Sequence, residues 1–318
     1  IEIFKKMVKN SDVVLENFRK GTLEKLGIGY DVISKINPKI ILCEISGYGR
    51  TGPYADKGGF DLVAQGMSGL MSITGESKDK PPMKVGAPIT DITAGLLAAS
   101  GILAALVHRN KTGEGQKVDT SLFEAGIVHT YWQSAIAGAT GQSPGPLGSA
   151  HPLTAPYQAF KTLDKWITVG ASNQNTWLML LKAINRMDLQ ENEMFSSNLN
   201  RKKNIIQLVE ILNAELIKKT SDEWLKIFDD NGLPCGPINS INEMFEDPQT
   251  IEREMIIEVD NKKAGTSKAI GMPIKFSKSK TEKSKGAPNL GEHTKEIMKI
   301  FNYNDEQIEN FYNRKVIL

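Results

Sequence analysis

The sequence has few of the residues that cross-link small proteins or bind metals. Its 318 residues include 2 cysteines, Cys43 and Cys235, and 4 histidines. The cysteines lie far apart and match no spacing typical of zinc ligands or of a disulfide framework. We therefore expect no metal site, no tightly bound cofactor and a reduced compartment. That compartment would be the cytoplasm, or the mitochondrion if the source is eukaryotic.

Charge of one sign and long apolar runs are also lacking. There are 39 basic and 37 acidic residues, for a net charge of +2, which does not favour nucleic acid as a partner. The apolar, uncharged stretch at residues 92–107 is shorter than the ~18–20 apolar residues of a membrane span, and Gly, Ser and Thr dilute it. We expect no membrane partner. The sequence opens on Ile1 with a pattern like the second half of a helix, so we expect the natural chain to extend upstream.

What is present is a regular alternation of apolar strands and helical patterns over the first part of the chain. Strand-like runs at 12–18 and 39–49, a helix over 91–109 and a glycine turn at 112–116 predict a Rossmann-like parallel α/β domain. We assign residues 1–136 to this large domain. A Gly/Pro/Ser-rich linker follows at 137–150.

The later part of the sequence has a different pattern. A hairpin with its turn near Asp164 and Lys165, followed by amphipathic helices over 175–228, predicts a smaller α+β domain at 151–255. Residues 256–318 would form a second linker and a return of the chain to the large domain, with two helices.

A lone acid, Asp91, precedes the small-residue helix. Thr90 or Asp91 could serve as its N-cap, and the helix dipole would keep a carboxylate there ionised. Two helical glycines, Gly95 and Gly101, cost about 1 kcal/mol each relative to Ala, so we expect another backbone or a ligand to approach closely. The residues alone leave two interpretations open. Asp91 is either a structural cap, the commoner role, or a nucleophile for an acyl group.

Long stretches of the sequence resemble the class III CoA-transferase family, the formyl-CoA transferase and carnitine-CoA-transferase-like group. They are "SDVVLENFRKGTLEKLG", "CEISGYGRTGPYADKGGFDLVAQGMSGLMSITG", "GAPITDITAGLLAASGILAAL", "KTGEGQKVDTSL", "GLPCGPINSINEMFEDPQ" and "PNLGEHTKEIM". The resemblance covers essentially the whole chain. It implies an interlocked homodimer, in which each chain threads through a ring made by the other. It also implies that this chain lacks the family's N-terminal portion, with its first strand and part of the CoA site.

The family's catalytic residue is the Asp of a "P-I-x-D-x-x-A-G" stretch, which is Asp91 here. The resemblance implies that Asp91 attacks the thioester carbonyl of an acyl-CoA to form a mixed anhydride. Coenzyme A then returns to make an aspartyl-CoA thioester, and an acceptor carboxylate completes the exchange. Coenzyme A is thus a substrate and not a resident cofactor.

Further positions are carried over from the resemblance. The loop "ENFRKG" would contact CoA, with the Phe18 ring near the adenine, and two lysines would meet the phosphates, although a solvated surface charge is the ordinary role of a lysine. Gln65 and Gly66 would line the pocket opposite Asp91. The expected CoA-binding residues are Asn17, Phe18, Arg19, Lys25, Lys57 and Gln65, and the expected substrate-pocket residues are Phe60, Gly66 and His151.

Two other functions remain open alongside the transferase. The α-methylacyl-CoA racemases resemble this sequence around Asp91, but their partner base is the histidine of a "G-H-D" stretch, where this chain has Phe60. Phenylalanine cannot take a proton, which favours a transferase over an isomerase. A non-catalytic CoA-binding protein is the third reading.

The sequence gives fewer indications of which acids the enzyme would exchange. The stretch "GSAHPLTAPYQAF" resembles members acting on dicarboxylic acids, such as succinyl-CoA:glutarate CoA-transferases, and no glycine-run loop typical of the oxalyl-CoA enzymes is present. We expect succinyl-CoA or a similar donor and a dicarboxylic acceptor. Within this stretch, His151 could face the acyl group or cap a turn. A distal carboxylate would need a cationic clamp, for which Arg50 is a weak candidate.

Overall fold

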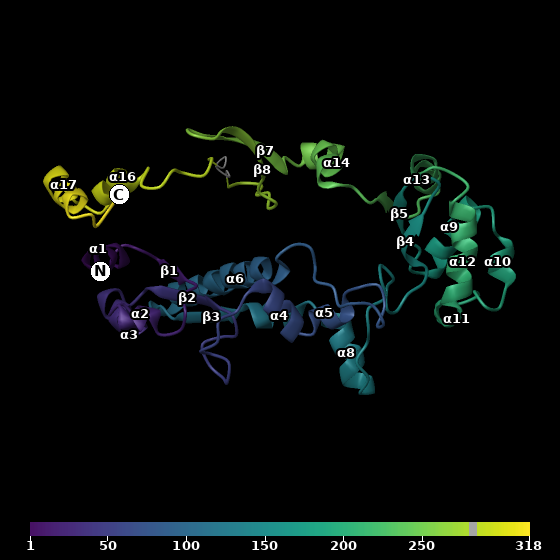
Figure 1. Ribbon diagram of the computed structural model, residues 1–318, viewed down its shortest axis with the longest axis horizontal. Coiled ribbons are helices and arrows are strands. Elements are labelled where there is room, and N and C mark those ends of the chain that lie inside the picture. The colour runs from purple at the N-terminus through teal and green to yellow at the C-terminus, as the bar shows by residue number, and fades with distance from the viewer. Residues whose placement is uncertain (280–284) are drawn as a thin grey trace. The chain divides into compact units, whose positions relative to one another are not determined.

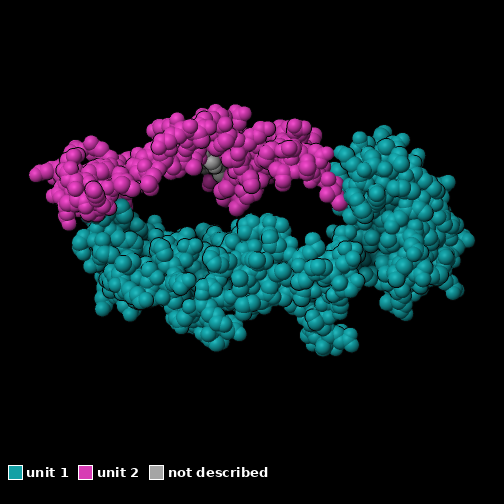
Figure 2. Space-filling model, viewed as in Figure 1, with its two compact units in different colours: residues 1–237 teal, residues 238–318 magenta. Residues whose placement is uncertain are grey.

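The computed structural model describes residues 1–279 and 285–318. The chain divides into two compact units, Ile1–Pro237 and Ile238–Leu318, which Figure 2 colours separately. The finer division expected from the sequence, with boundaries at residues 136, 150 and 255, stays a prediction.

A three-stranded parallel sheet organises the first part of the larger unit, which confirms the expected mixed α/β class with a parallel sheet (Figure 1). Its middle strand is almost completely buried, because Ile41, Leu42 and Cys43 are at most 1% exposed, as in strands covered on both faces. The strands, in the order in which they pair, are β1 (Val13–Glu16), β2 (Ile41–Ser46) and β3 (Lys117–Ser121).

Helices cover both faces of this sheet. Leu42 packs in one apolar cluster with Val8 and Ile33, whereas Ile45 packs in another with Ala94. Side chains alternate along a strand, so positions 42 and 45 point to opposite faces. The helices of this part are α1 (Glu2–Val8), α2 (Thr22–Lys25), α3 (Tyr30–Ile36), α4 (Asp61–Met67), α5 (Leu70–Ile73), α6 (Ile89–Thr112), α7 (Leu122–Val128) and α8 (Tyr131–Thr140).

The long helix α6 runs antiparallel to the strands. Near its end, Arg109 forms an ion pair with Asp12 at 2.9 Å, just before β1 begins. The first turn of α6 therefore lies at the opposite edge of the sheet, where the parallel strands end. Gly101 allows the helix to approach β3, since a Cβ there would lie 2.6 Å from Val118 Cγ1. Among the described residues, α6 is the one helix long and apolar enough to cross a membrane, a test that core helices of soluble proteins also pass.

The remainder of the larger unit contains an antiparallel sheet packed with helices, and its hairpin turns at Asp164 and Lys165 as predicted. The short third strand was not predicted, because three residues that include a proline carry almost no strand signal. The elements are β4 (Tyr157–Lys161), β5 (Trp166–Gly170), α9 (Gln174–Ala183), α10 (Asp188–Glu191), α11 (Asn198–Lys203), α12 (Ile205–Leu216), α13 (Ser221–Asp230) and β6 (Cys235–Pro237).

The smaller unit is built from short elements. Ser240 caps its first helix in a capping box with Glu243. Two helices end the chain, as predicted. A two-stranded hairpin was not foreseen in this part. The elements are α14 (Ile241–Glu246), α15 (Pro248–Glu252), β7 (Ile256–Asn261), β8 (Gly265–Ile270), α16 (Thr294–Ile300) and α17 (Asp305–Asn313).

Candidate active site

Asp91 lies in the first turn of α6, at the carboxyl edge of the parallel sheet. This is the edge at which open α/β sheets bind their ligands. The helix begins at Ile89, its N-cap is Pro88, and no side chain of the cap residue bonds to the first turn. The expectation that Thr90 or Asp91 is the N-cap is therefore wrong.

A carboxylate from another helix takes over the capping role. Asp61, the first residue of α4, accepts hydrogen bonds at Oδ1 from the Thr90 backbone N–H (3.0 Å) and the Thr90 hydroxyl (2.8 Å). Its Oδ2 accepts from Gln65 Nε2 at 2.8 Å, and Gln65 Oε1 in turn accepts from the Val85 N–H at 2.9 Å. Asp61 thus satisfies a donor of the helix N-terminus from outside the helix.

The Asp91 carboxylate itself is exposed and unpaired. It has no hydrogen-bond or ion-pair partner within residues 1–279 and 285–318. Partial burial, and to a smaller extent the negative charge of Asp61, raise the pKa of Asp91 above its usual value. The expectation that the helix dipole keeps this carboxylate ionised stays a prediction, and desolvation and a neighbouring acid act in the opposite direction. A partly desolvated, unpaired carboxylate is a better nucleophile than a fully hydrated or ion-paired one.

Close backbone packing shapes the surroundings of Asp91. Gly47, directly after β2, and Gly59, directly before Phe60, approach each other so closely that a Cβ on either would lie within 2.7 Å of the other's backbone. A Cβ on Gly126 of α7 would lie 2.3 Å from Ser68 Oγ and 3.4 Å from Thr90 Cγ2. These glycines fix the loops and helices around the start of α6.

The loop after β1 carries the residues expected to contact CoA. Asn17, Phe18 and Arg19 are all exposed, and the Phe18 ring retains 56% of its surface. The two lysines expected to meet phosphates are exposed as well. Lys25 ends α2, and the Lys57 ammonium lies 4.1 Å from the centre of the Tyr54 ring. All five side chains are accessible to a ligand, and their assignment to CoA stays a prediction.

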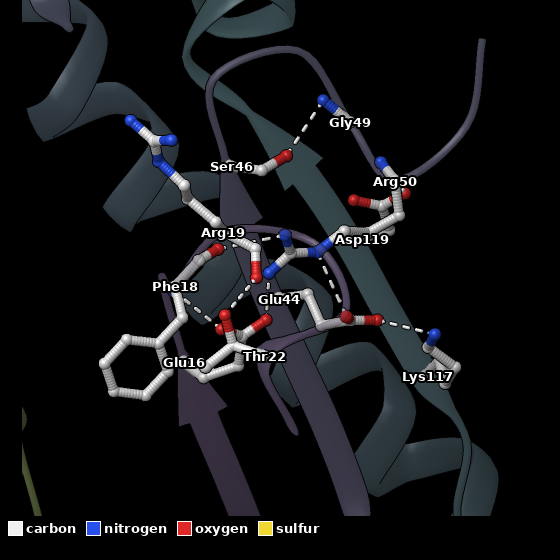
Figure 3. A network of polar contacts seen from close by, with 10 residues as sticks. All are labelled: Glu16, Phe18, Arg19, Thr22, Glu44, Ser46, Gly49, Arg50, Lys117 and Asp119. Carbon is white, nitrogen blue, oxygen red and sulfur yellow. Dashed lines mark hydrogen bonds and ion pairs between the residues drawn. The ribbon is translucent and has the colours of Figure 1, made fainter. Parts of the chain in front are cut away.

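Arg50 is placed differently from the expected carboxylate clamp. Its guanidinium is 9% exposed and forms ion pairs with Glu16 and Glu44 (Figure 3). A guanidinium committed to two carboxylates is not available to bind a substrate acid, so the structure does not support Arg50 as the clamp.

Three further residues expected at the CoA or substrate site fall into two groups. The Gln65 side chain is fully buried and supports the site through Asp61 and Val85, as described above. Gly66 and Phe60 face outward, and the Phe60 ring is 79% exposed at the start of α4.

His151 caps a turn, one of its two anticipated roles. Its Nδ1 accepts hydrogen bonds from the Leu153 and Thr154 N–H groups at 3.1 and 3.2 Å. The ring lies between Trp132 and Tyr157, with centroid distances of 4.8 and 5.2 Å. Burial and nearby Lys202 lower the pKa of His151, so the neutral ring, with its proton on Nε2, is favoured.

Sequence reasoning missed two residues near Asp91. Asp61 stood in the quoted stretch "GGFD", where an acid at a helix start was the available signal. His129 Nε2 lies 2.6 Å from Thr93 Oγ1, which links the end of α7 to the second turn of α6. Among the described residues, no group of three or more His, Cys, Asp or Glu side chains could hold a metal ion.

Fold and site define an α/β enzyme with a ligand-binding edge and an unpaired carboxylate at that edge. The chain belongs to CoA-transferase family III, whose family model matches residues 1–294. It is therefore a CoA-transferase, and acyl-CoA thioesters are its substrates.

Known relatives agree with this assignment. The chain is 36% identical to the succinyl-CoA:glutarate CoA-transferase of Mus musculus, over 97% of this chain and 71% of the relative. It is 34% identical to the succinate–glutarate CoA-transferase of Agrobacterium fabrum, over 93% of this chain and 74% of the relative. A crystal structure of a CAIB/BAIF family protein from Brucella suis superposes with a TM-score of 0.82 at 34% identity. That match covers 95% of this chain and 78% of the other.

Proposed function

We propose that this CoA-transferase moves CoA from succinyl-CoA, or a similar acyl-CoA, to a dicarboxylic acid through covalent intermediates on Asp91. The observation that carries the proposal is the unpaired, partly desolvated Asp91 carboxylate in the first turn of α6. The names of two relatives, both of which pair succinate with glutarate, support the dicarboxylate class.

The exchange needs no net proton transfer. Asp91 attacks the thioester carbonyl, the C–S bond breaks, and CoA leaves as a thiolate, which yields a mixed anhydride. The thiolate then attacks the Asp91 carbonyl carbon, which forms an aspartyl-CoA thioester and releases the donor acid as a carboxylate. The acceptor carboxylate runs the same two steps in reverse, so the thioester's free energy is conserved throughout.

Backbone groups are suited to stabilise the tetrahedral oxyanions of each step. The glycine-rich loop between β2 and α4, which includes Gly47 and Gly59, begins at the same edge of the sheet as Asp91. Preorganised N–H donors of this kind stabilise developing negative charge strongly where water is excluded.

Covalent trapping tests the proposal. The protein is mixed with succinyl-CoA, treated with hydroxylamine and digested, and the peptides are analysed by mass spectrometry. We expect a hydroxamate on the Asp91 peptide, absent in Asp91→Ala and present in the matched control Asp56→Asn, which alters an exposed acid on the loop after β2. Absence of the hydroxamate from the wild-type protein would contradict the proposed mechanism. Competition among glutarate, oxalate and acetate as acceptors then ranks the acids.

We further propose that the protein is a homodimer. Ile92, Leu96, Leu103 and Val107 recur at intervals of four, seven and four along α6, and each is 48–64% exposed. Such spacing places them on one face of the helix, and exposed apolar stripes of this length mark association surfaces.

A further inference from the structure

Three carboxylates stand side by side across the parallel sheet. Glu16 of β1 is directly opposite Glu44 of β2, and Glu44 is directly opposite Asp119 of β3. Glu16 and Glu44 are only 7% and 6% exposed. Like charges directly opposite each other destabilise a sheet, and buried carboxylates are costly unless they are paired.

Arg50 and Lys117 compensate this row of acids (Figure 3). The Arg50 guanidinium pairs with Glu16 and, through Nε at 3.0 Å, with Glu44, while the Arg50 backbone N–H donates to Asp119 Oδ2 at 2.9 Å. Lys117 Nζ pairs with the other Glu44 oxygen at 2.7 Å. Arg50, which comes from the loop after β2, therefore contacts the end of all three strands.

The same network holds the backbone of Phe18 from both sides. Glu16 Oε2 accepts the Phe18 N–H at 2.7 Å, and Arg50 Nη1 donates to the Phe18 carbonyl oxygen at 3.0 Å. Figure 3 shows the Phe18 ring directed away from these charges. One guanidinium thus hydrogen-bonds to the Glu16 carboxylate and to the Phe18 carbonyl, and it also forms an ion pair with Glu44. A lysine ammonium cannot reproduce that planar fork.

We propose that Arg50 is a positioning residue for the nucleotide end of the CoA donor. It ties the loop after β2 to the loop after β1 and presets the backbone of Phe18, so that residues 17–19 offer a ready-made surface to CoA. This inference rests on the proposed function and on the prediction that those residues contact CoA. Presetting a loop strengthens binding because less conformational freedom is lost when the ligand binds.

A buried charge network of this kind need not stabilise the fold, since apolar replacements often serve as well. A purely structural role would therefore affect the whole site equally. A positioning role would affect only the part of the substrate that meets Phe18. The two roles can be distinguished with two probes, one that is the nucleotide end of the donor and one that is a donor without the nucleotide.

The experiment uses Arg50→Lys and two probes. Calorimetry measures the dissociation constant of 3′-phosphoadenosine 5′-diphosphate, the nucleotide end of CoA. Mass spectrometry measures the rate at which succinyl-pantetheine, which lacks the nucleotide, labels Asp91 in the presence of hydroxylamine. We expect nucleotide binding to weaken about tenfold, because displacement of a preset contact loses affinity on that scale. The labelling rate should stay within about twofold of wild type.

Matched variants complete the test. Arg109→Lys alters an ion-paired arginine at the opposite edge of the same sheet, and it should leave both measurements unchanged. The double variant Glu16→Gln/Arg50→Gln removes the network without leaving a lone buried charge, and it should repeat the split if Arg50→Lys folds poorly. Unchanged nucleotide binding, or equal losses in both measurements, would overturn the proposal.

Failure of the proposed function gives a different result. In that case the wild-type protein shows no Asp91 label with either thioester, or Phe18→Ala leaves nucleotide binding intact. If wild type is labelled and Phe18→Ala selectively weakens nucleotide binding while Arg50→Lys does not, then only the role of Arg50 is refuted.

Discussion

Two carboxylates adjoin Thr90: Asp61 contacts it from another helix, and Asp91 is the next residue in the chain. Asp61 bonds to both the backbone N–H and the hydroxyl of Thr90, while Asp91 follows next in the chain with its carboxylate unpaired among the described residues. One acid thus orders the helix start and the other is left available. The charge of the first raises the pKa of the second, although partial burial is the larger cause.

Asp61→Asn tests this coupling. Asparagine retains an oxygen that can accept from Thr90 but removes the negative charge, so the pKa of Asp91 should fall. Only the ionised Asp91 attacks, so activity is lost as pH drops through its pKa. The acidic limb of the kcat/KM profile for succinyl-CoA should therefore move to lower pH in the variant. An unmoved limb, or a limb moved equally by Asp56→Asn, would rule out electrostatic coupling between the two acids.

The sequence predicted the position of Asp91 but not its support. A lone acid ahead of a helix rich in small residues is visible in the sequence, and the resemblance to a family fixed its proposed role. The bond from Asp61 spans 29 positions, and nothing local to either residue indicates it. For the same reason Arg50 was taken for a free cation, because its partners lie on strands that only the folded sheet brings together.

At the scale of elements, α6 depends on glycine for its approach to the sheet. A Cβ on Gly101 would lie 2.6 Å from Val118 Cγ1, which is bonded directly to the branched Cβ of the valine. Val118 has little freedom to turn away, because valine is stiff at χ1. The helix must then shift from β3, and its first turn would shift with it.

Gly101→Ala should therefore destabilise the protein by about 1–3 kcal/mol, the usual cost of overpacking, despite alanine's higher helix propensity. Gly138→Ala is the matched control, because Gly138 also lies in a helix, α8, but has nothing within 4 Å of its missing Cβ. It should be neutral or stabilise the fold by up to about 1 kcal/mol. Chemical denaturation of both variants measures the difference, and equal stabilities would show that α6 does not need the close approach.

Elements with strong local signals were predicted well, and those without were missed. The parallel strands, α6 and the hairpin at Asp164 follow from periodicity and turn residues. The hairpin of β7 and β8 was taken for a linker, because its strands are mostly exposed and show no apolar alternation strong enough to indicate a sheet. Its pairing comes from backbone hydrogen bonds, which the side-chain pattern does not report.

At the scale of the whole molecule, the exposed apolar stripe of α6 needs an explanation. Its four large side chains begin one residue after Asp91 and continue along the helix almost to its end. A surface of this kind in water favours association, and its continuity with Asp91 would place a covering partner next to the active site. The proposed homodimer therefore predicts that assembly and catalysis depend on the same helix.

Leu103→Lys tests that dependence, because position 103 lies three turns from Asp91 and its side chain is 64% exposed. A charge in a buried interface is costly, so the variant should sediment as a monomer at concentrations where the wild-type protein sediments as a dimer. Leu199→Lys, on α11 with a similar exposure of 63%, should leave assembly unchanged. A wild-type protein that stays monomeric at all concentrations would refute the homodimer. If Leu103→Lys dissociates the dimer and also abolishes hydroxamate formation at Asp91, the interface and the active site are coupled.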